Sequence, residues 1–337
     1  MAASRGTLAD VAKAAGVSVP TVSKVLNGRA DVSEATRAKV QQALQDTGYT
    51  AKRLQGNDLA GVIDLIIEGV DSPWALEIVR GAEAAAAHRG SAVVVTSSVN
   101  PGFDLRSWLD AVAARHSDGV IAALPTLGAE QLRALQELKA PVVVIDPSGD
   151  VPDRFATVGA TNWAGSFAAT ERLLELGHTR IGLIAGPSNV PAAVQRLEGY
   201  ASALRRNGVA FDPRLVTEAE FRVTGGHAAA TKLLDLPERP TAIIASSDQQ
   251  AAGLYEAARE RDIRIPSELS VIGFDDTVLS RYLSPALTTV HQPLADMAAE
   301  AMRLVHELAA NPEARVARHL ELATTMIERR SAISLSS

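Results

Sequence analysis

The 337-residue sequence contains no cysteine, which excludes disulfide scaffolds, cysteine-ligated zinc sites and thiol catalysis. It has no apolar run near the roughly 18 residues of a membrane span, and no charged-then-apolar leader with a cleavage site. We therefore expect a cytoplasmic protein without a membrane anchor. Hydrophobic residues make up 47% of the chain and charged residues 21%, which suffices for two or three domains with packed cores.

The chain also lacks the signature loops of common enzymes. No G-x-G-x-x-G follows a predicted strand, and G-x-x-x-x-G-K-[ST], G-x-S-x-G and H-E-x-x-H are absent. The nearest approach is Gly182–Ser188, whose spacing is wrong and in which Pro187 removes a phosphate-binding N–H. The seven histidines are scattered, and His178 and His227 are expected at the surface. We expect no enzyme, cofactor or metal site; a cytoplasmic enzyme acting on a sugar or nucleotide stays the alternative.

Charge is distributed unevenly along the chain, although the net charge of −6 by itself argues against a nucleic-acid binder. Residues 1–58 carry eight basic and five acidic side chains, a net of +3. The remainder carries 25 basic and 34 acidic side chains, a net of −9. A small basic head on an acidic body is the asymmetry expected when one end of a protein meets phosphate.

The basic head predicts three short helices around a small core. Thr7 caps the first, whose apolar side chains repeat at i, i+3, i+4 and i+7 before a stop at Gly16. Ser18 caps the second, which tolerates Pro20 in its first turn, and Ser33 caps the third. Two short helices joined by a tight turn and supported by a third form a helix-turn-helix unit. A bundle that binds protein or merely covers the body is the alternative.

The outer face of the second helix is small, polar or cationic. Such a face fits the major groove of DNA, about 12 Å wide, with its N-terminal residues at the base edges. The residues on this face are Val19, Pro20, Thr21, Ser23, Lys24 and Asn27.

The head closely resembles the DNA-binding domain of the lactose-repressor (LacI/GalR-type) family. The resemblance is carried by the strings Thr7–Ser18, Thr21–Gly28, Val32-Ser33, Thr36-Arg37, Val40 and Gly48-Tyr49. It implies a sequence-specific transcriptional regulator, expected to be a repressor, that binds a near-palindromic operator as a homodimer. In that family the start of the second helix reads bases, which here would be done by Val19, Pro20 and Lys24. The residues that would hold phosphates are Thr7, Ser18, Thr21, Ser23, Asn27 and Ser33, and helix capping explains each hydroxyl equally well.

The segment after the head departs from the family. Relatives carry Pro-Asn and a short helix that inserts a Leu into the minor groove. Here Ala51 and Lys52 replace Pro and Asn, and Asp58 stands at the usual Leu position. We therefore expect no wedge of the usual kind, but a basic arm at phosphates or in the minor groove. The candidate DNA contacts of this segment are Tyr49, Lys52, Arg53 and Leu54.

From residue 61 onward, apolar runs alternate with helix-length segments in two sets of four. The predicted strands are Val62–Ile67, Ala92–Val95, Val120–Ala123, Val142–Ile145, Ile181–Ile184, Leu215–Val216, Ala242–Ala245 and Val271–Phe274. The predicted helices include Trp74–His88, Gln131–Leu138, Asn162–Leu176, Ala193–Arg206 and Gln249–Arg261. This spacing is typical of βαβ units, so we predict two doubly wound lobes with parallel sheets.

The body also resembles the effector domain of the same family, which is similar to periplasmic sugar-binding proteins. The matching strings include Leu176-Gly177-His178, Arg196-x-x-Gly199-Tyr200, Ser247-Asp248, Val271–Asp276 and Leu287–Pro293. The resemblance implies residues 1–50 as the head, 51–60 as a hinge and 61–337 as an effector-binding and dimerisation domain. The first lobe would comprise about 61–161 and 292–322, including a strand Val316–Leu322, and the second about 162–291 and 323–337. A binding protein without DNA function stays an alternative, although it would need an export signal.

Ligands of this architecture bind at the carboxyl ends of the strands, between the lobes. Acidic groups and an arginine around aromatic rings suit a sugar. The candidate effector-binding residues are Asp71, Trp74, Asp146, Asn162, Trp163, Arg196, Phe221, Ser247, Asp248 and Asp275. Structural roles are the alternative: a core position for Trp74, packing for Phe221, helix caps for the aspartates and a clamp between Arg196 and Asp275.

Overall fold

The computed structural model describes residues 8–26, 32–47, 60–124, 126–147, 151–152, 155–311 and 318–335. The chain divides into two compact units, residues 1–58 and residues 59–337, which are described separately. Within those ranges no helix is long and apolar enough to cross a membrane. Six predicted DNA contacts lie outside the described residues: Thr7, Asn27, Tyr49, Lys52, Arg53 and Leu54.

The first unit contains three helices, as predicted: α1 (Leu8–Ala15), α2 (Val19–Leu26) and α3 (Glu34–Asp46). Its core is small, and each helix contributes a fully buried valine to it: Val11, Val22 and Val40. The expected capping by Ser18 is confirmed, because its Oγ accepts a hydrogen bond from the Thr21 backbone N–H at 3.3 Å. Ser33 caps α3 through Thr36 in the same way, and Gly16 ends α1 with a φ of 67°.

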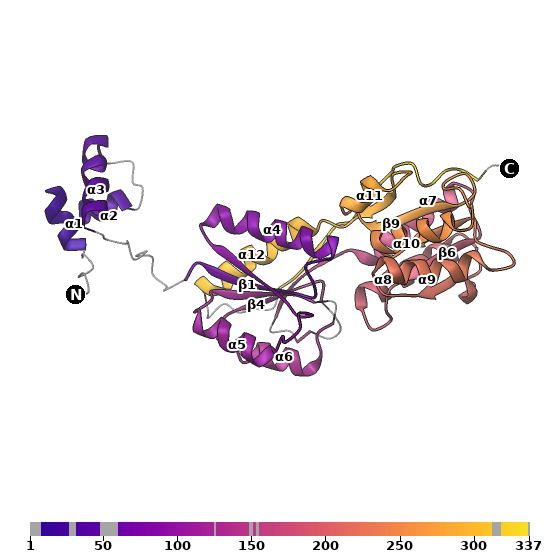
Figure 1. Ribbon diagram of the computed structural model, residues 1–337, viewed down its shortest axis with the longest axis horizontal. Helices are drawn as coiled ribbons and strands as arrows, with labels where there is room; N and C mark the ends of the chain where they lie inside the picture. The colour runs from indigo at the N-terminus through magenta and orange to yellow at the C-terminus, as the bar shows by residue number, and fades with distance from the viewer. Residues whose placement is uncertain are drawn as a thin grey trace. The chain divides into compact units, whose positions relative to one another are not determined.

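The second unit contains two doubly wound lobes, which confirms the predicted fold class (Figure 1). Lobe 1 has a parallel sheet in the order β2–β1–β3–β4–β5–β11. Its strands are β1 (Val62–Ile67), β2 (Ala92–Ser97), β3 (Gly119–Ala123), β4 (Val142–Ile145), β5 (Ala156–Ala160) and β11 (His319–Leu322). The apolar side chains of α4 (Pro73–Arg89) and α12 (Leu294–Ala310) pack on one face, and those of α5 (Leu105–Ala114) and α6 (Ala129–Gln136) pack on the other.

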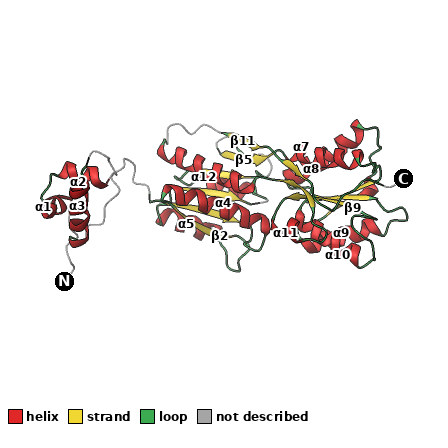
Figure 2. Ribbon diagram, turned by 90° about the horizontal axis from the view of Figure 1, so that it is seen from above, coloured by secondary structure: helices red, strands yellow, loops and turns green. Residues whose placement is uncertain are grey.

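Lobe 2 repeats the arrangement in the order β7–β6–β8–β9–β10–β12. Its strands are β6 (Ile181–Ala185), β7 (Val216–Glu218), β8 (Ala242–Ala245), β9 (Ser270–Asp275), β10 (Thr288–His291) and β12 (Thr325–Ile327), and only β12 is antiparallel to its neighbour. Helices α7 (Asn162–Glu175) and α8 (Pro191–Arg206) cover one face, and α9 (Val223–Leu234) and α10 (Asp248–Arg259) cover the other (Figure 2). The short α11 (Val278–Tyr282) follows β9.

The chain crosses between the lobes three times. It passes from β5 to α7, returns from β10 to α12, and passes again from β11 to β12. The second crossing explains why α12, drawn in gold in Figure 1, packs beside α4 from the first part of the chain. Each strand of one sheet therefore has an equivalent in the other, with β4 corresponding to β9.

Three helix pairs approach closely because a glycine lies between them. A Cβ on Gly81 of α4 would meet the carbonyl oxygen of Ala295 in α12. A Cβ on Gly199 of α8 would likewise meet the carbonyl oxygen of Trp163 in α7, and a Cβ on Gly226 of α9 would meet the carbonyl oxygen of Gln250 in α10. Interiors are close-packed, so these helix spacings leave no room for a methyl group.

The predicted strands Val62–Ile67, Val142–Ile145 and Ala242–Ala245 match the structure at both ends, and the other five differ by one or two residues. Strands β5 and β10 were not predicted, because their sequences ATVGA and TTVH contain no apolar run. The surface position expected for His178 is wrong. Its ring is 2% exposed and binds Thr241 and the Ile333 carbonyl oxygen, at 2.9 and 3.0 Å.

We predict that Gly81→Ala lowers the free energy of unfolding by about 1–3 kcal/mol, because the new methyl group must push two backbones apart. Without this clash, the replacement of glycine by alanine would stabilise the helix by up to about 1 kcal/mol. A variant more stable than the wild type would therefore contradict the close approach. Gly159→Ala is the matched control. Its Cβ would lie 3.8 Å from the nearest atom, in Pro147, and a change within about 0.5 kcal/mol is expected in urea unfolding.

Candidate functional site

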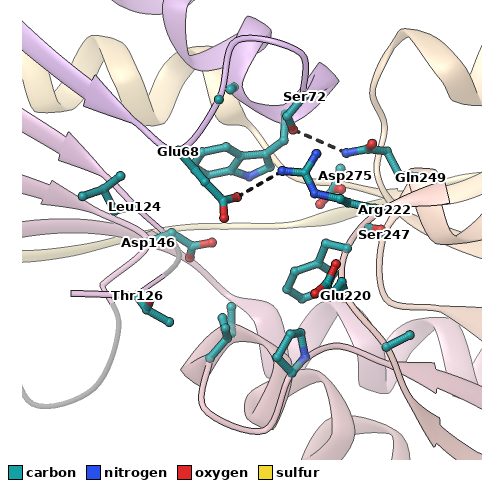
Figure 3. A pocket seen from close by; sticks show the side chains of 18 of the residues that line it. Glu68, Ser72, Leu124, Thr126, Asp146, Glu220, Arg222, Ser247, Gln249 and Asp275 are labelled. Atoms are coloured by element: carbon teal, nitrogen blue, oxygen red, sulfur yellow. Dashed lines mark hydrogen bonds and ion pairs between the residues drawn. The ribbon is translucent and has the colours of Figure 1, made fainter. Parts of the chain in front are cut away.

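A cavity of about 750 Å³ lies between the two lobes and is lined by both of them (Figure 3). This volume lies within the range of pockets that hold small molecules, about 300–1,000 Å³. Lobe 1 lines it with Glu68, Gly69, Ser72, Trp74, Ala75, Ala123, Leu124, Thr126 and Asp146. Lobe 2 lines it with Pro187, Asn189, Val190, Ala192, Arg196, Glu218, Ala219, Glu220, Phe221, Arg222, Ser247, Gln249 and Asp275.

The polar lining residues sit where parallel strands end. Glu68 directly follows β1, Asp146 follows β4 and Glu218 ends β7. Ser247 follows β8 by one residue, and Asp275 ends β9. The carboxyl ends of parallel strands meet at one edge of a sheet, so both sheets present polar side chains to the same space.

Two lining aspartates occupy equivalent places in the two lobes and share an uncommon backbone. Asp146, after β4, has a φ of 51°, and Asp275, at the end of β9, has a φ of 107°. Positive φ disfavours residues with a Cβ, and residues held this way concentrate at ligand sites. The packing of the two sheets thus fixes both carboxylates at the cavity.

The buried guanidinium of Arg196 connects the crossing segments. Its Nε donates to Asn162 Oδ1 at 2.9 Å and its Nη2 to Gln292 Oε1 at 3.1 Å. Its Nη1 donates to the Ser246 carbonyl oxygen and lies 3.6 Å from Asp275 Oδ1. Asn162 starts α7 and Gln292 precedes α12, so one side chain from α8 holds two of the three crossings.

Asp248 and Asp275 are buried carboxylates beside this network. Burial raises the pKa of Asp275 well above its ordinary value, and the Arg196 charge opposes that rise while Asp248 adds to it. Burial also raises the pKa of Asp248 to about 7, against hydrogen bonds from Thr289 and Thr277. Asp275 Oδ1 is buried and accepts no hydrogen bond, which leaves an acceptor available to a ligand at the cavity wall.

Aromatic side chains from opposite lobes also line the cavity. Trp74 lies in the first turn of α4, and Phe221 lies in the loop between β7 and α9. Phe221 packs against Val190 and Ala193, and a Cβ on Gly186 would collide with its ring. Aromatic rings provide flat apolar surface for the C–H face of a sugar ring.

Polar contacts also join the lobes across the mouth of the cavity (Figure 3). Arg222 Nη1 donates to Asp71 Oδ2 at 3.3 Å, and its Nη2 lies 3.8 Å from Glu68 Oε2. Gln249 Nε2 donates to Ser72 Oγ at 3.4 Å. These contacts are long or partly exposed, so each one contributes little to stability.

The structure brings six of the ten predicted effector residues together in the lining. They are Trp74, Asp146, Arg196, Phe221, Ser247 and Asp275. Neither Asp146 nor Asp275 caps a helix, and Ser247 caps α10 by accepting from the Gln250 N–H at 3.1 Å.

The other four predicted residues lie outside the lining. Asn162 is behind it, bound to Arg196, and also lines a smaller cavity of about 430 Å³. Asp248 is fully buried beneath it, bound to Thr277 and Thr289, and is not the cap expected of it. Asp71 lies at the rim, where its side chain is 69% exposed. Trp163 stacks on Phe167 with ring centroids 4.9 Å apart, because its side of α7 faces away from the cavity.

Sequence reasoning missed several polar lining residues. They are Glu68, Ser72, Thr126, Asn189, Glu218, Glu220, Arg222 and Gln249. Most of them follow a strand or begin a helix, the signal that identified Asp146 and Ser247. The strand before Glu218 and Glu220 was predicted as Leu215–Val216, but β7 runs two residues further and ends at Glu218, so these two side chains were not identified.

The first unit presents the predicted outer face of α2. Val19 is 42% exposed, and Pro20 and Lys24 are exposed, whereas Thr21 is half-buried. Ser23 lies on the same helix. In the part of the chain that the structure describes, no cluster of three or more His, Asp or Glu side chains could hold a metal ion.

Comparisons with known proteins match two parts of the chain. Residues 7–52 match the family described as "Bacterial regulatory proteins, lacI family", and residues 170–332 match a "Periplasmic binding protein-like domain". The chain is 34% identical to the HTH-type transcriptional repressor CytR of Escherichia coli K12 over 305 residues, covering 89% of this chain and 88% of that protein. It is 31% identical to the ribose operon repressor of the same organism, covering 97% and 99%.

Solved structures agree with this relationship. A complex of the transcriptional regulator CelR with cellobiose superposes with a TM-score of 0.75 at 32% identity, covering 97% of this chain and 100% of that one. The lac repressor dimer bound to operator and the anti-inducer ONPF superposes with a TM-score of 0.77 at 26% identity, covering 98% and 100%. The chain therefore belongs to the lacI family of bacterial regulatory proteins and is a transcriptional regulator, not an enzyme.

Proposed function

We propose that this protein is a cytoplasmic, sequence-specific repressor whose affinity for a near-palindromic DNA operator is controlled by a sugar bound between the two lobes. The observation that carries the proposal is the cavity of about 750 Å³, which places two aromatic side chains and a buried carboxyl oxygen that accepts no hydrogen bond around one space. The related CelR structure contains cellobiose, and the related lac repressor is bound to operator.

The first unit is proposed to read the operator. Val19 and Pro20 begin α2 and are exposed, but their side chains have no hydrogen-bond donors. They contact apolar features such as a thymine methyl group, whereas Lys24 is the proposed donor to base edges. Ser18, Thr21, Ser23 and Ser33 are proposed to contact phosphates, a role compatible with capping by Ser18 and Ser33.

Two copies are proposed to act together, because one small head makes too few contacts for tight and selective binding. Lobe 1 offers a surface for pairing. Leu76 on α4 is 54% exposed, Val95 on the edge strand β2 is 37% exposed, and Val70 and Val99 lie in adjoining loops at 64% and 56%. The related lac repressor is a dimer. We assign residues 1–50 to DNA binding, 51–60 to the hinge and 61–337 to effector binding and dimerisation.

The effector is proposed to act by changing how the lobes close. Its lining residues come from both lobes, so a bound sugar contacts Asp146 on one side and Asp275 on the other. It then favours the lobe arrangement that it binds better. The change in operator affinity equals its differential affinity for the two arrangements.

We predict that Asp275→Asn abolishes the response to the effector and leaves operator affinity unchanged. The substitution removes the ionisable carboxyl group that lines the cavity and replaces one of its two oxygens with an NH2 donor, and it lies in a different unit from α2. A thermal-shift screen of sugars on the full chain identifies the effector, and DNA binding is then measured with and without it. Asp110→Asn, on the exposed side of α5, is the control and keeps the response. A wild-type response from Asp275→Asn would place the effector site elsewhere.

We predict that Lys24→Ala relaxes base preference at one position in each half-site, at a cost of about 1–3 kcal/mol. The reason is that a base contact discriminates between sequences, whereas a phosphate contact does not. Binding to an operator library at fixed salt measures both effects. Lys39→Ala, exposed on α3, is the control and leaves the base preference intact. Uniform weakening across all sequences would instead assign Lys24 to phosphate.

A further inference from the structure

Acidic side chains outnumber basic ones in the described lining of the cavity. Five acidic side chains line it: Glu68, Asp146, Glu218, Glu220 and Asp275. Two arginines oppose them, Arg196 and Arg222. A neutral sugar, its phosphate ester and its amine differ in charge, so an acidic lining binds them with different affinity.

Both arginines already face carboxylates, and Arg196 has no free edge for an anionic ligand. The Arg196 guanidinium is already bound to Asn162, Gln292 and the Ser246 carbonyl oxygen, and it lies 3.6 Å from Asp275. One of its faces is covered by Phe274, whose ring centroid is 3.7 Å from Cζ. A phosphate group prefers a guanidinium that can offer two parallel N–H bonds, and the N–H groups of Arg196 already bind protein acceptors.

Arg222 also faces carboxylates. It lies between Asp71 Oδ2, at 3.3 Å, and Glu68 Oε2, at 3.8 Å, so the two carboxylates together outweigh its single charge. Figure 3 shows Glu68 and Arg222 facing each other at the cavity, with Glu220, Asp146 and Asp275 also drawn around it.

The cavity is a binding site for a reason independent of its acidic residues. Asp275 is 6% exposed, lines the space and has a buried Oδ1 with no hydrogen-bond partner. Trp74 and Phe221 contribute flat apolar surface to the same space. An acceptor without a hydrogen bond beside aromatic rings fits a ligand that donates hydroxyl or amine hydrogens.

We propose that this site takes an uncharged or amine-bearing polyhydroxy effector and rejects the phosphate or carboxylate derivative of the same molecule. The inference rests on the proposed function, in that it specifies the charge of the effector. Glu68, Glu218 and Glu220 set the selection, because their exposed carboxylates carry negative charge at the wall of the cavity. Repulsion between these carboxylates and a phosphate group makes the phosphate ester bind at least about tenfold more weakly than the parent molecule.

The first experiment measures the field in the cavity without any effector. The chain has three tryptophans: Trp74 lines the cavity, Trp108 is 7% exposed, and Trp163 is 41% exposed outside it. In a Trp163→Phe background, the fluorescence that added ions quench therefore comes mainly from Trp74. Each quenching constant is divided by the constant of the same ion with free tryptophan amide at the same ionic strength. We expect the normalised quenching by caesium to exceed that by iodide, and an equal or larger normalised value for iodide overturns the proposal.

Charge-neutral variants show which carboxylates create the field. Glu68→Gln, Glu218→Gln and Glu220→Gln, combined in one chain, are expected to remove the preference for caesium. The matched control combines Glu83→Gln, Glu130→Gln and Glu198→Gln, which change the net charge equally at exposed helix positions outside the lining. The control keeps the preference. Loss of the preference in both variants overturns the assignment to the cavity residues.

The second experiment measures ligand choice on the full wild-type chain. A thermal-shift panel contains pentoses, hexoses, disaccharides and nucleosides, each beside its phosphate ester, with glucosamine as the amine. We expect an unphosphorylated member to raise the unfolding temperature. Its phosphate ester is expected to need a concentration at least about tenfold higher for the same rise. A preference for the ester overturns this proposal and leaves the proposed function standing. If no member of the panel changes the unfolding temperature, the proposed function is refuted. The quenching experiment then tests only whether the cavity is negatively charged.

Discussion

The two-lobed body depends on one buried charge, the guanidinium of Arg196. A charge removed from water must be compensated by hydrogen bonds and opposite charge, or the fold loses several kcal/mol. Here the compensation comes from Asn162 at the first crossing, from Gln292 at the second and from the ends of β8 and β9. The segments that connect the lobes are therefore held at the same point that forms the floor of the cavity.

This arrangement explains how one constraint serves both stability and binding. Asp146 accepts hydrogen bonds from Asn162 and Gln292, each at 3.4 Å, so the carboxylate from lobe 1 joins the network of lobe 2. Asp275 faces Arg196 yet keeps Oδ1 without a hydrogen bond. A ligand that satisfies this oxygen contacts the network that determines how the lobes meet. Small changes at such a packed junction shift the balance between discrete arrangements.

The repeated architecture places residues from both lobes at equivalent positions around the cavity, whereas other side chains of the lining differ between the lobes. Asp146 and Asp275 are equivalent by topology and share a positive φ, so the two sheets deliver carboxylates from opposite sides. The loops beyond the strands are unlike. Lobe 2 adds Glu218 at the end of β7 and Glu220 and Arg222 after it, whereas lobe 1 adds Glu68 and Ser72 after β1. The linings contributed by the two lobes therefore differ in their loops, while the fold that carries these loops is common to the family.

The amino-acid sequence by itself determined the three helices of the head, the alternation of strands and helices, and the family. Strong local signals carry this information: caps such as Ser18 and Ser33, and continuous apolar runs such as Val62–Ile67 in strands buried on both faces. Sequence also identified Arg196 and Asp275, whose motifs match the family. Only the tertiary structure decided that Asp248 lies beneath the cavity, that Trp163 faces away from it, and that Glu218, Glu220 and Arg222 line it. Those outcomes depend on which side of a helix packs inward and on how two lobes meet, and both are set by contacts between residues far apart in the chain.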